Sequence, residues 1–484
     1  MSPVGRAGGA SSDSMLFHSA EYAVLLTVVF VAYFGLARIG ALRLLVLLAA
    51  SYLFYAWWSP YYLVLIIASS LLDYWVGGTM HRTSDDRRRR QLLLISLVGN
   101  LGLLATFKYF NFFSDSMAMA LTHFGLPAHR LHLDVVIPVG ISFYTFQSLS
   151  YTIDIYRRRL EPVRGPLGFM VFVAFFPQLV AGPIVRAAEF LPQIKPFPTL
   201  SASQAGRGLF WIAVGLVKKV VIADLLAVNL VDRVFEMPSR YTSAELLCGV
   251  YGYALQIYCD FSAYSDIAIG SALLLGYVLP VNFNAPYRAL NLRDFWRRWH
   301  ISLSTWLRDY LYLSLGGSRG SAWQTYRNLI LTMLLGGLWH GAGWTFVAWG
   351  ALHGVGLAVT RAVQRESLPS ATAPWLRPLL ILATFHYVCL GWIFFRSPGF
   401  ERAWELLVGL GQLTAGTANV SPLLWALLAA GALTHLVPDR WVDWTRDLVI
   451  RCPAPLQALL LAGAVVGIRL ARTTEVVPFI YFQF

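Results

Sequence analysis

The chain has 484 residues, of which 57% are apolar and only 13% are charged. Ordinary soluble domains carry about 25% charged residues, so this composition excludes a soluble globular protein and predicts a membrane protein with several spans. The net charge of +13 comes from arginine clusters beside hydrophobic runs. Such clusters indicate cytoplasmic loops and anionic lipid rather than nucleic acid.

The first part of the sequence predicts three membrane spans. Residues 1–14 are small and polar, and we expect a disordered extension ahead of a single membrane domain over residues 15–484. Three apolar runs follow, at 22–37, 44–58 and 61–77. The next segment holds Arg87 to Arg90, which the positive-inside rule places in the cytoplasm. Because three spans precede this loop, the N-terminus is expected outside.

The remaining apolar runs predict further spans. They lie at 92–107, 135–153, 209–230, 246–275, 379–395, 423–436 and 456–468. Arginines 157–159 form a second cytoplasmic marker. Between residues 169 and 184, Pro177, Gly182 and Pro183 predict a bent or re-entrant helix that lines a cavity.

Four charged residues fall inside predicted spans. Lys218 and Lys219 are expected to extend their amines to the membrane interface, an interpretation favoured over a substrate contact. For Asp260 and Asp266, pairing with a cationic side chain of another helix is favoured over a direct role in chemistry.

The stretch that begins at Asn291 is crowded with arginine, tryptophan and tyrosine. On a helical count, one face carries a polar stripe formed by Arg293, Arg297, His300, Ser304 and Arg308. The opposite face is apolar, which predicts an amphipathic helix at the membrane interface. On this interpretation His300 lies on the solvent-facing, positively charged side of the helix. The pattern alone favours a surface histidine over a catalytic one.

A second histidine, His340, occurs in an almost uncharged stretch. It follows Asn328 by about 12 residues, or about 18 Å along a helix, which is past the middle of a hydrocarbon core about 30 Å thick. Glycines at 336, 337, 341 and 343 flank it and predict close backbone approach or a helix break. An ionisable group at this depth indicates a functional site. The alternative is a core histidine bonded to a neighbouring carbonyl.

Four segments together resemble the membrane-bound O-acyltransferase family. They are ISFYTFQSLSYTIDIYR from Ile141, FFPQLVAGPIVR from Phe175, FWRRWHISLSTWLRDYLY from Phe295 and LLGGLWHGAGWTFVAWGALHG from Leu334. The resemblance is to the bacterial branch that includes alginate O-acetylation proteins and the D-alanyl transfer protein of teichoic acids, with core motifs over about 135–360. It also makes Met15, which opens MLFHSAEY, a second candidate for the start of translation.

The resemblance implies the fold and the catalytic residues. It implies an all-α polytopic membrane protein, with roughly 10–12 transmembrane helices plus re-entrant and interfacial helices around a central funnel. It places the family's catalytic histidine at His340 and the second functional histidine of the bacterial branch at His300. A neutral histidine suits O-acyl transfer, because it accepts the proton of an attacking hydroxyl as general base.

The expected reaction moves an acyl group, acetyl above all, from a cytoplasmic thioester to hydroxyls of an extracytoplasmic polysaccharide, directly or through a periplasmic partner protein. The donor is expected to be acetyl-coenzyme A or an acyl carrier protein thioester, with no bound cofactor or metal. Arg293, Arg297 and Arg308 are the candidate donor-binding residues. The chain is expected in the bacterial inner membrane, where it contacts lipid.

Two other classes remain open at this point. Asp260, Asp266 and His340 are also compatible with a transporter or proton relay, although no inverted repeat is visible. A membrane scaffold that recruits a secreted polysaccharide enzyme is the third. Within acyl transfer, D-alanyl-type transfer from a carrier protein is the alternative to acetyl transfer.

Overall fold

The computed structural model describes residues 15–36, 38–180, 182–194, 197, 199–363, 373–453, 455–457, 459–460, 462–463, 466 and 478–480. Across these residues the regular structure is helical, without a strand, as the all-α prediction requires. The predicted N-terminal extension and parts of the predicted span at 456–468 lie outside the described residues. The chain packs as two units. The prediction of one membrane domain over residues 15–484 stays a prediction.

The first unit comprises the residues up to Ser201 together with Ser271–Leu279. Its helices are α1 (Ala20–Gly35), α2 (Gly40–Trp58), α3 (Leu63–Arg82), α4 (Asp86–Leu104), π-helix η1 (Ala105–Tyr109), α5 (Phe110–His123), α6 (Ile141–Tyr156), α7 (Pro166–Ala174), α8 (Phe176–Leu179) and α9 (Ala187–Ile194). The segment predicted as bent is indeed broken, because α7 ends at Ala174 and only the short α8 follows before Gly182.

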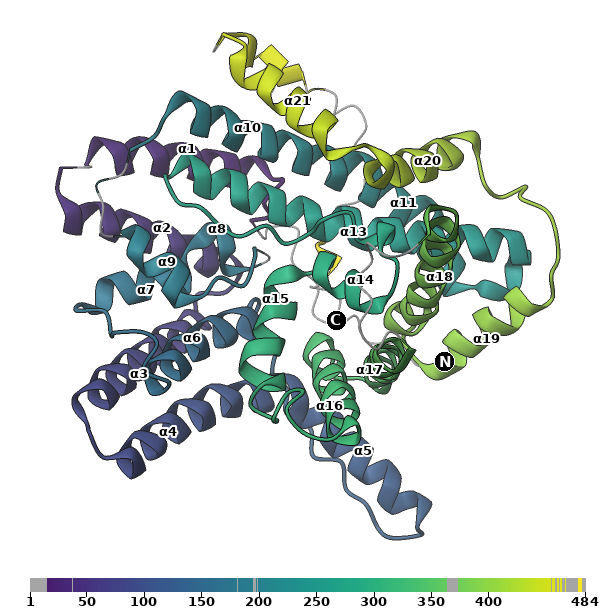
Figure 1. Cartoon of the computed structure of the whole chain (residues 1–484), viewed down its shortest axis with the longest axis horizontal. Helices are drawn as coiled ribbons and strands as arrows, with labels where there is room; N and C mark the ends of the chain where they lie inside the picture. Colours follow the sequence, from purple (N-terminus) through teal and green to yellow (C-terminus); the bar gives the residue numbers. More distant parts are fainter. Residues whose placement is uncertain are drawn as a thin grey trace. The chain divides into compact units, whose positions relative to one another are not determined.

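Helix α6 forms the core of this unit, where it packs against α3 and α4 (Figure 1). All its residues except Ile153 and Tyr156 are buried. At Gly77 of α3, an added Cβ would stand 2.6 Å from the Tyr151 ring, so this glycine permits the close approach of α3 and α6. Between the helices, the buried Asp73 carboxylate accepts hydrogen bonds from Ser96, Asn100 and Ser148. These bonds satisfy a charge that would otherwise be costly to bury.

The second unit comprises Ala202–Gly270 and Pro280–Tyr481, and the last four residues of its helix Ser243–Leu274 are assigned to the first unit. Its helices are α10 (Ala202–Val217), π-helix η2 (Lys218–Ala223), α11 (Asp224–Leu226), π-helix η3 (Ala227–Val231), α12 (Asp232–Glu236), 3-10 helix η4 (Pro238–Arg240), α13 (Ser243–Leu274), 3-10 helix η5 (Pro286–Arg288), α14 (Leu292–Arg298), α15 (Ile301–Trp306), π-helix η6 (Leu307–Tyr312), α16 (Ala322–His340), α17 (Trp344–Val363), 3-10 helix η8 (Pro374–Leu376), α18 (Arg377–Arg396), α19 (Phe400–Gly411), α20 (Pro422–Leu436) and α21 (Asp439–Arg451).

Buried ion pairs tie η2 to the long helix α13. Lys219 is fully buried, and its amine lies 2.8 Å from Asp224 and 2.9 Å from Asp260. Lys218 pairs with Asp266. The prediction that both aspartates pair with cations of another helix is confirmed. The prediction that both lysines reach the interface is wrong, because the carboxylates of α11 and α13 compensate their charge inside the protein.

Five helical segments of the described chain are long and apolar enough to cross a membrane. They are Gly40–Trp58, Leu63–Arg82, Asp86–His123, Trp344–Val363 and Pro374–Arg396. The bent pair of α20 with Arg440–Arg451 would make a sixth. Some of the other predicted spans form helices that are shorter, such as α1, or interrupted by π-helical turns, as at residues 202–236. Within the described residues, length and composition therefore assign fewer spans than the 10–12 predicted, in part because an apolar run in the sequence need not form one uninterrupted helix.

Candidate active site

The predicted amphipathic helix around His300 is broken at the histidine itself. Helix α14 ends at Arg298, and the Trp299 amide closes it on the Phe295 carbonyl at 2.8 Å. His300 then adopts a left-handed conformation with φ 43°, which is uncommon for a residue with a side chain. Helix α15 starts directly afterwards. The break rotates the histidine away from the face on which the helical count placed it.

His300 is consequently buried, with no exposed surface. The prediction that His300 lies on a solvent-facing, positively charged face of the helix is wrong. Arg293, Arg297 and Arg308 are exposed, and Arg308 forms an ion pair with its neighbour Asp309. The structure thus separates the buried histidine from the three exposed arginines, which a continuous helix would have placed on one face.

Asn282 fixes the position of His300 from outside the helical segment. The backbone carbonyl of Asn282 accepts a hydrogen bond from Ile301 at 2.9 Å, at the start of α15. Its side-chain oxygen lies 3.2 Å from His300 Nδ1 and accepts bonds from the amide (3.2 Å) and the hydroxyl (2.9 Å) of Ser302. Its amide nitrogen donates to Ser265 at 3.1 Å. These partners identify which end of the Asn282 side-chain amide is the oxygen and which is the nitrogen.

The Asn282 contacts determine the tautomer of His300. A backbone N–H can only donate, so the Asn282 atom that it reaches is the carbonyl oxygen. That oxygen can only accept, and Nδ1 of His300 must therefore carry a hydrogen and donate it. The lone pair then resides on Nε2. Burial lowers the pKa of His300 below its ordinary value, which favours this neutral form.

His340 is the last residue of α16, with Gly341 as the C-cap. The predicted break at the glycines is confirmed, since α17 begins at Trp344. The histidine is buried, and its ring centroid lies 5.0 Å from those of Trp339 and Trp349 and 5.2 Å from that of Phe395. His340 is therefore held in an aromatic pocket formed by α16, α17 and α18.

Two glycines bring α16 and α17 together beside His340. A Cβ added at Gly337 would collide with the Phe346 carbonyl, and one added at Gly350 would collide with the Met333 carbonyl. Only residues without a side chain allow the two backbones to approach this closely. The glycines near His340 thus position the histidine through helix packing as well as through the break.

One tryptophan contacts both histidines. The Trp339 ring lies 6.2 Å from that of His300 and 5.0 Å from that of His340. The fold therefore brings together two residues that are 40 positions apart in the sequence. A buried region with two imidazoles and an aromatic lining suits acid–base chemistry on a substrate that is shielded from water.

Sequence reasoning missed several residues that form this region. Asn282 is the most important of them, and only its position in the polar segment NFNA distinguishes it in the sequence. Phe261 packs edge-on against His300 at 4.6 Å. Phe479 in turn contacts Phe261 at 5.7 Å, and the Ile480 amide donates to Asp260 at 2.8 Å. Residues near the end of the chain therefore pack behind the His300 site, which no local pattern indicated.

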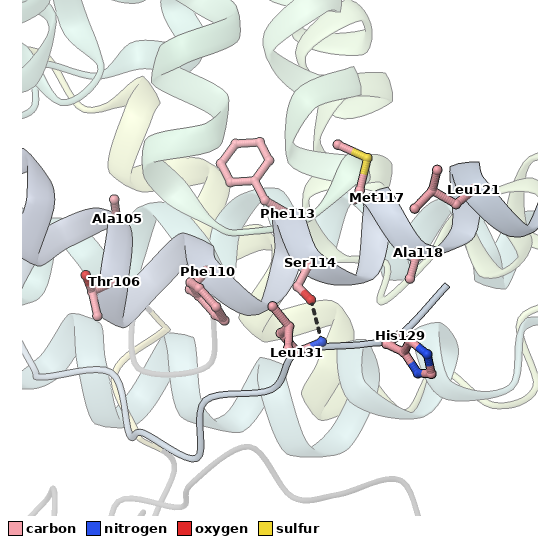
Figure 2. A pocket seen from close by; sticks show the side chains of 10 residues that line it. All are labelled: Ala105, Thr106, Phe110, Phe113, Ser114, Met117, Ala118, Leu121, His129 and Leu131. Atoms are coloured by element: carbon pink, nitrogen blue, oxygen red, sulfur yellow. Dashed lines mark hydrogen bonds between the residues drawn. The ribbon is translucent and has the colours of Figure 1, made fainter. Parts of the chain in front are cut away.

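A separate cavity of about 450 Å³ lies on α5 in the first unit (Figure 2). Its lining is mainly apolar and includes Phe113 and Met117, and the Leu131 amide donates to Ser114 at 3.0 Å across it. Its lining includes neither His300 nor His340. We therefore assign it no part in the chemistry of the two histidines.

The helical fold and the apolar spans define a multi-pass membrane protein, in which two buried histidines contact the same tryptophan. Comparison with known proteins makes this class specific. Residues 91–397 match the model of MBOAT, the membrane-bound O-acyltransferase family. The chain belongs to this family, and it is an O-acyltransferase.

Several curated relatives are similar over most of the chain. A probable alginate O-acetylase of Azotobacter vinelandii is 44% identical over 71% of this chain and 68% of its own length. A peptidoglycan O-acetyltransferase of Helicobacter pylori is 40% identical over 66% of this chain and 64% of its own length. A teichoic acid D-alanyltransferase of Bacillus subtilis is 28% identical over 57% of this chain and 72% of its own length. The chain thus spans about two thirds of the length of these relatives.

Proposed function

We propose that this protein transfers an acetyl group from a cytoplasmic thioester to hydroxyls of an extracytoplasmic polysaccharide, directly or through an extracytoplasmic acyltransferase partner. The names of the 44% and 40% identical relatives, a probable alginate O-acetylase and a peptidoglycan O-acetyltransferase, support this choice of group and acceptor class. The observation that carries the proposal is the pair of buried histidines that share Trp339. The inner membrane is the compartment in which a cytoplasmic donor and an external acceptor are both within reach.

In the proposed step, His340 is the general base. An acceptor hydroxyl oxygen attacks the thioester carbonyl carbon while His340 takes the hydroxyl proton. The carbon–sulfur bond then breaks, the acetyl group stays on the acceptor oxygen, and the proton passes to the departing thiolate. Free thiol and O-acetyl ester are the products, so atoms and charge balance. The thioester is already activated and provides the leaving group.

His300 has a supporting role in this proposal. Its neutral ring, held by Asn282, presents Nε2 as an acceptor, which suits orientation of a substrate N–H or O–H. Because His300 is buried and apart from the exposed arginines, recognition of an anionic donor is assigned to the arginines in this proposal. Acetyl-coenzyme A and an acyl carrier protein both present phosphate or acidic groups to Arg293, Arg297 and Arg308.

Acetyl transfer is testable in proteoliposomes that contain the purified protein and radiolabelled acetyl-coenzyme A inside. We expect loss of donor thioester in proportion to O-acetyl ester formed on an added polysaccharide or partner protein outside. A transporter or scaffold would not consume donor in this proportion. Absence of thioester consumption with both acetyl-coenzyme A and an acetylated carrier protein would contradict the proposal.

D-alanyl-type transfer from a carrier protein is the second candidate, favoured by the teichoic acid relative. Charging the carrier protein with D-alanine in the same assay separates the two. The transporter alternative has less support. A proton relay needs Asp260 and Asp266 to exchange protons, whereas Lys219 and Lys218 hold both in buried ion pairs.

The donor-binding arginines lead to a kinetic prediction. Arg297→Ala is expected to raise the KM for the thioester donor more than it lowers kcat, because it removes binding that is equal in the ground and transition states. Donor titrations on the purified variant in lipid measure both constants. Arg293→Ala should act in the same direction. Arg319→Ala is the matched control, because Arg319 is exposed but is not one of the candidate donor-binding residues. A loss confined to kcat would remove Arg297 from the donor site.

The topology is a second prediction. With the N-terminus outside, cysteines substituted for Arg88 and Arg158 are expected to react with a membrane-impermeant maleimide only after cells are permeabilised. Ser59→Cys, in the turn between α2 and α3, should react in intact cells. Each new cysteine is introduced into a Cys452→Ser variant, because Cys452 is partly exposed and the other three native cysteines are buried. Reaction of both arginine-site cysteines from outside would reverse the assigned orientation.

A further inference from the structure

A basic pocket lies in the first unit where α3 and α6 end. Its volume is about 470 Å³, and its lining includes His81, Arg82, Arg89, Arg158 and Arg159, with Glu161 as the acidic residue among the lining side chains. Helix α3 is one of the five segments suited to cross a membrane, and it ends at Arg82. The pocket therefore lies at the end of a candidate membrane span.

Arg89 forms one wall of this pocket. Its side chain is buried and donates to the Met80 carbonyl at 2.6 Å and to the Ile155 and Tyr156 carbonyls at 2.9 and 3.0 Å. These are terminal carbonyls of α3 and α6, which carry partial negative charge. Arg89 thus joins the C-terminal ends of the two helices, and its hydrogen bonds fix the position of its own guanidinium group.

The other arginines of the pocket are not compensated in this way. Arg82 and Arg159 are exposed and form no ion pair within the described part of the chain. Arg158 contacts Asp86 at 3.4 Å, but both side chains are largely exposed, and such surface pairs contribute little. The hydroxyl-bearing residues Thr83 and Ser84 also line the pocket. The Thr83 hydroxyl already donates to the Thr79 carbonyl at 3.0 Å, so the pocket combines exposed guanidinium groups with the Ser84 hydroxyl.

We propose that this pocket binds a phosphate group. A guanidinium presents a planar fork of donors that matches phosphate oxygens, and basic pockets at the ends of membrane helices suit anionic headgroups. The phosphate has two possible sources: the headgroup of an anionic lipid such as phosphatidylglycerol, or a soluble phosphate compound. The chemistry of recognition is the same for both, and the test separates them.

The test uses the full-length protein purified in neutral detergent. One arm measures bound phosphatidylglycerol against phosphatidylcholine by native mass spectrometry, and the other titrates inorganic pyrophosphate by calorimetry. Arg82→Gln with Arg159→Gln is the pocket variant. Arg88→Gln with Arg90→Gln is the matched control, because it removes the same charge from exposed positions of α4 outside the pocket.

We expect the pocket variant to weaken binding at least tenfold in one arm, and the control to change it less than twofold. An effect confined to phosphatidylglycerol assigns the site to lipid, and an effect on pyrophosphate assigns it to soluble phosphate. Equal weakening in the two variants would show that net charge alone is responsible and would overturn the proposal. So would failure of the wild-type protein to bind either probe. Thermal unfolding of each variant confirms that it is folded.

Discussion

His340→Gln is expected to lower kcat by about 10²- to 10⁴-fold at saturating donor, the usual contribution of a positioned general base. Glutamine keeps much of the volume and polarity of histidine but does not accept a proton at neutral pH. Because the proton is transferred only in the transition state, the loss should appear in kcat rather than in binding of the donor. Steady-state transfer of labelled acetyl in lipid measures it.

A second buried histidine provides the control for this variant. His353 on α17 is fully buried, and its ring lies 4.7 Å from the same Trp349 that contacts His340. We expect His353→Gln to retain activity within tenfold, since this residue packs in the core and accepts a hydrogen bond from Trp296 at 3.3 Å. A folded His340→Gln enzyme with activity within tenfold of wild type would remove His340 from the chemical step.

The features that the sequence could predict are those that depend on neighbouring residues. Apolar runs give the location of most helices, and the glycines around His340 predict the end of α16. The pairing of Asp260 with a cation of another helix was also predictable, although its partner was not, because a buried carboxylate needs a cation. The apolar runs and the glycines act within a few turns of one helix. A buried carboxylate acts over a longer distance, but few kinds of partner can compensate its charge.

The position of His300 could not be predicted in this way. A helical count assumes that the helix continues, whereas the Asn282 carbonyl accepts the Ile301 amide and allows the chain to break at His300. That contact joins residues separated by a helix and a turn, so no periodicity records it. Lys219 is a similar case. The rule that lysines extend to the interface fails where Asp224 and Asp260 converge on one amine.

The contacts of Asn282 suggest how the protein keeps His300 ready for the reaction. A buried imidazole without a fixed partner would divide its population between two tautomers, and only one presents the Nε2 lone pair. Asn282 selects that tautomer, and Ser302 and Ser265 hold Asn282 in turn. Asn282 is therefore a positioning residue, whose effect on the reaction passes through His300.

Asn282→Ala is expected to lower kcat by about 10- to 100-fold, because a buried group left without its partner costs about 1–3 kcal/mol. Asn282→Asp gives the sharper test. In the wild-type protein, burial lowers the pKa of His300. A carboxylate next to Nδ1–H would stabilise the imidazolium and so raise this pKa. His300 would then become protonated, and lose its Nε2 lone pair, at a higher pH than in the wild-type enzyme.

The acidic limb of the kcat–pH profile should therefore move to higher pH in Asn282→Asp, with activity largely retained on the alkaline side. Ser302→Ala is the matched control. It removes one hydroxyl bond to the same Asn282 oxygen but leaves the bond to His300, so its profile should keep the wild-type shape. A purely structural Asn282 would lower the rate equally at all pH values. A profile for Asn282→Asp that is reduced in height but unshifted would show that Asn282 does not control the protonation of His300.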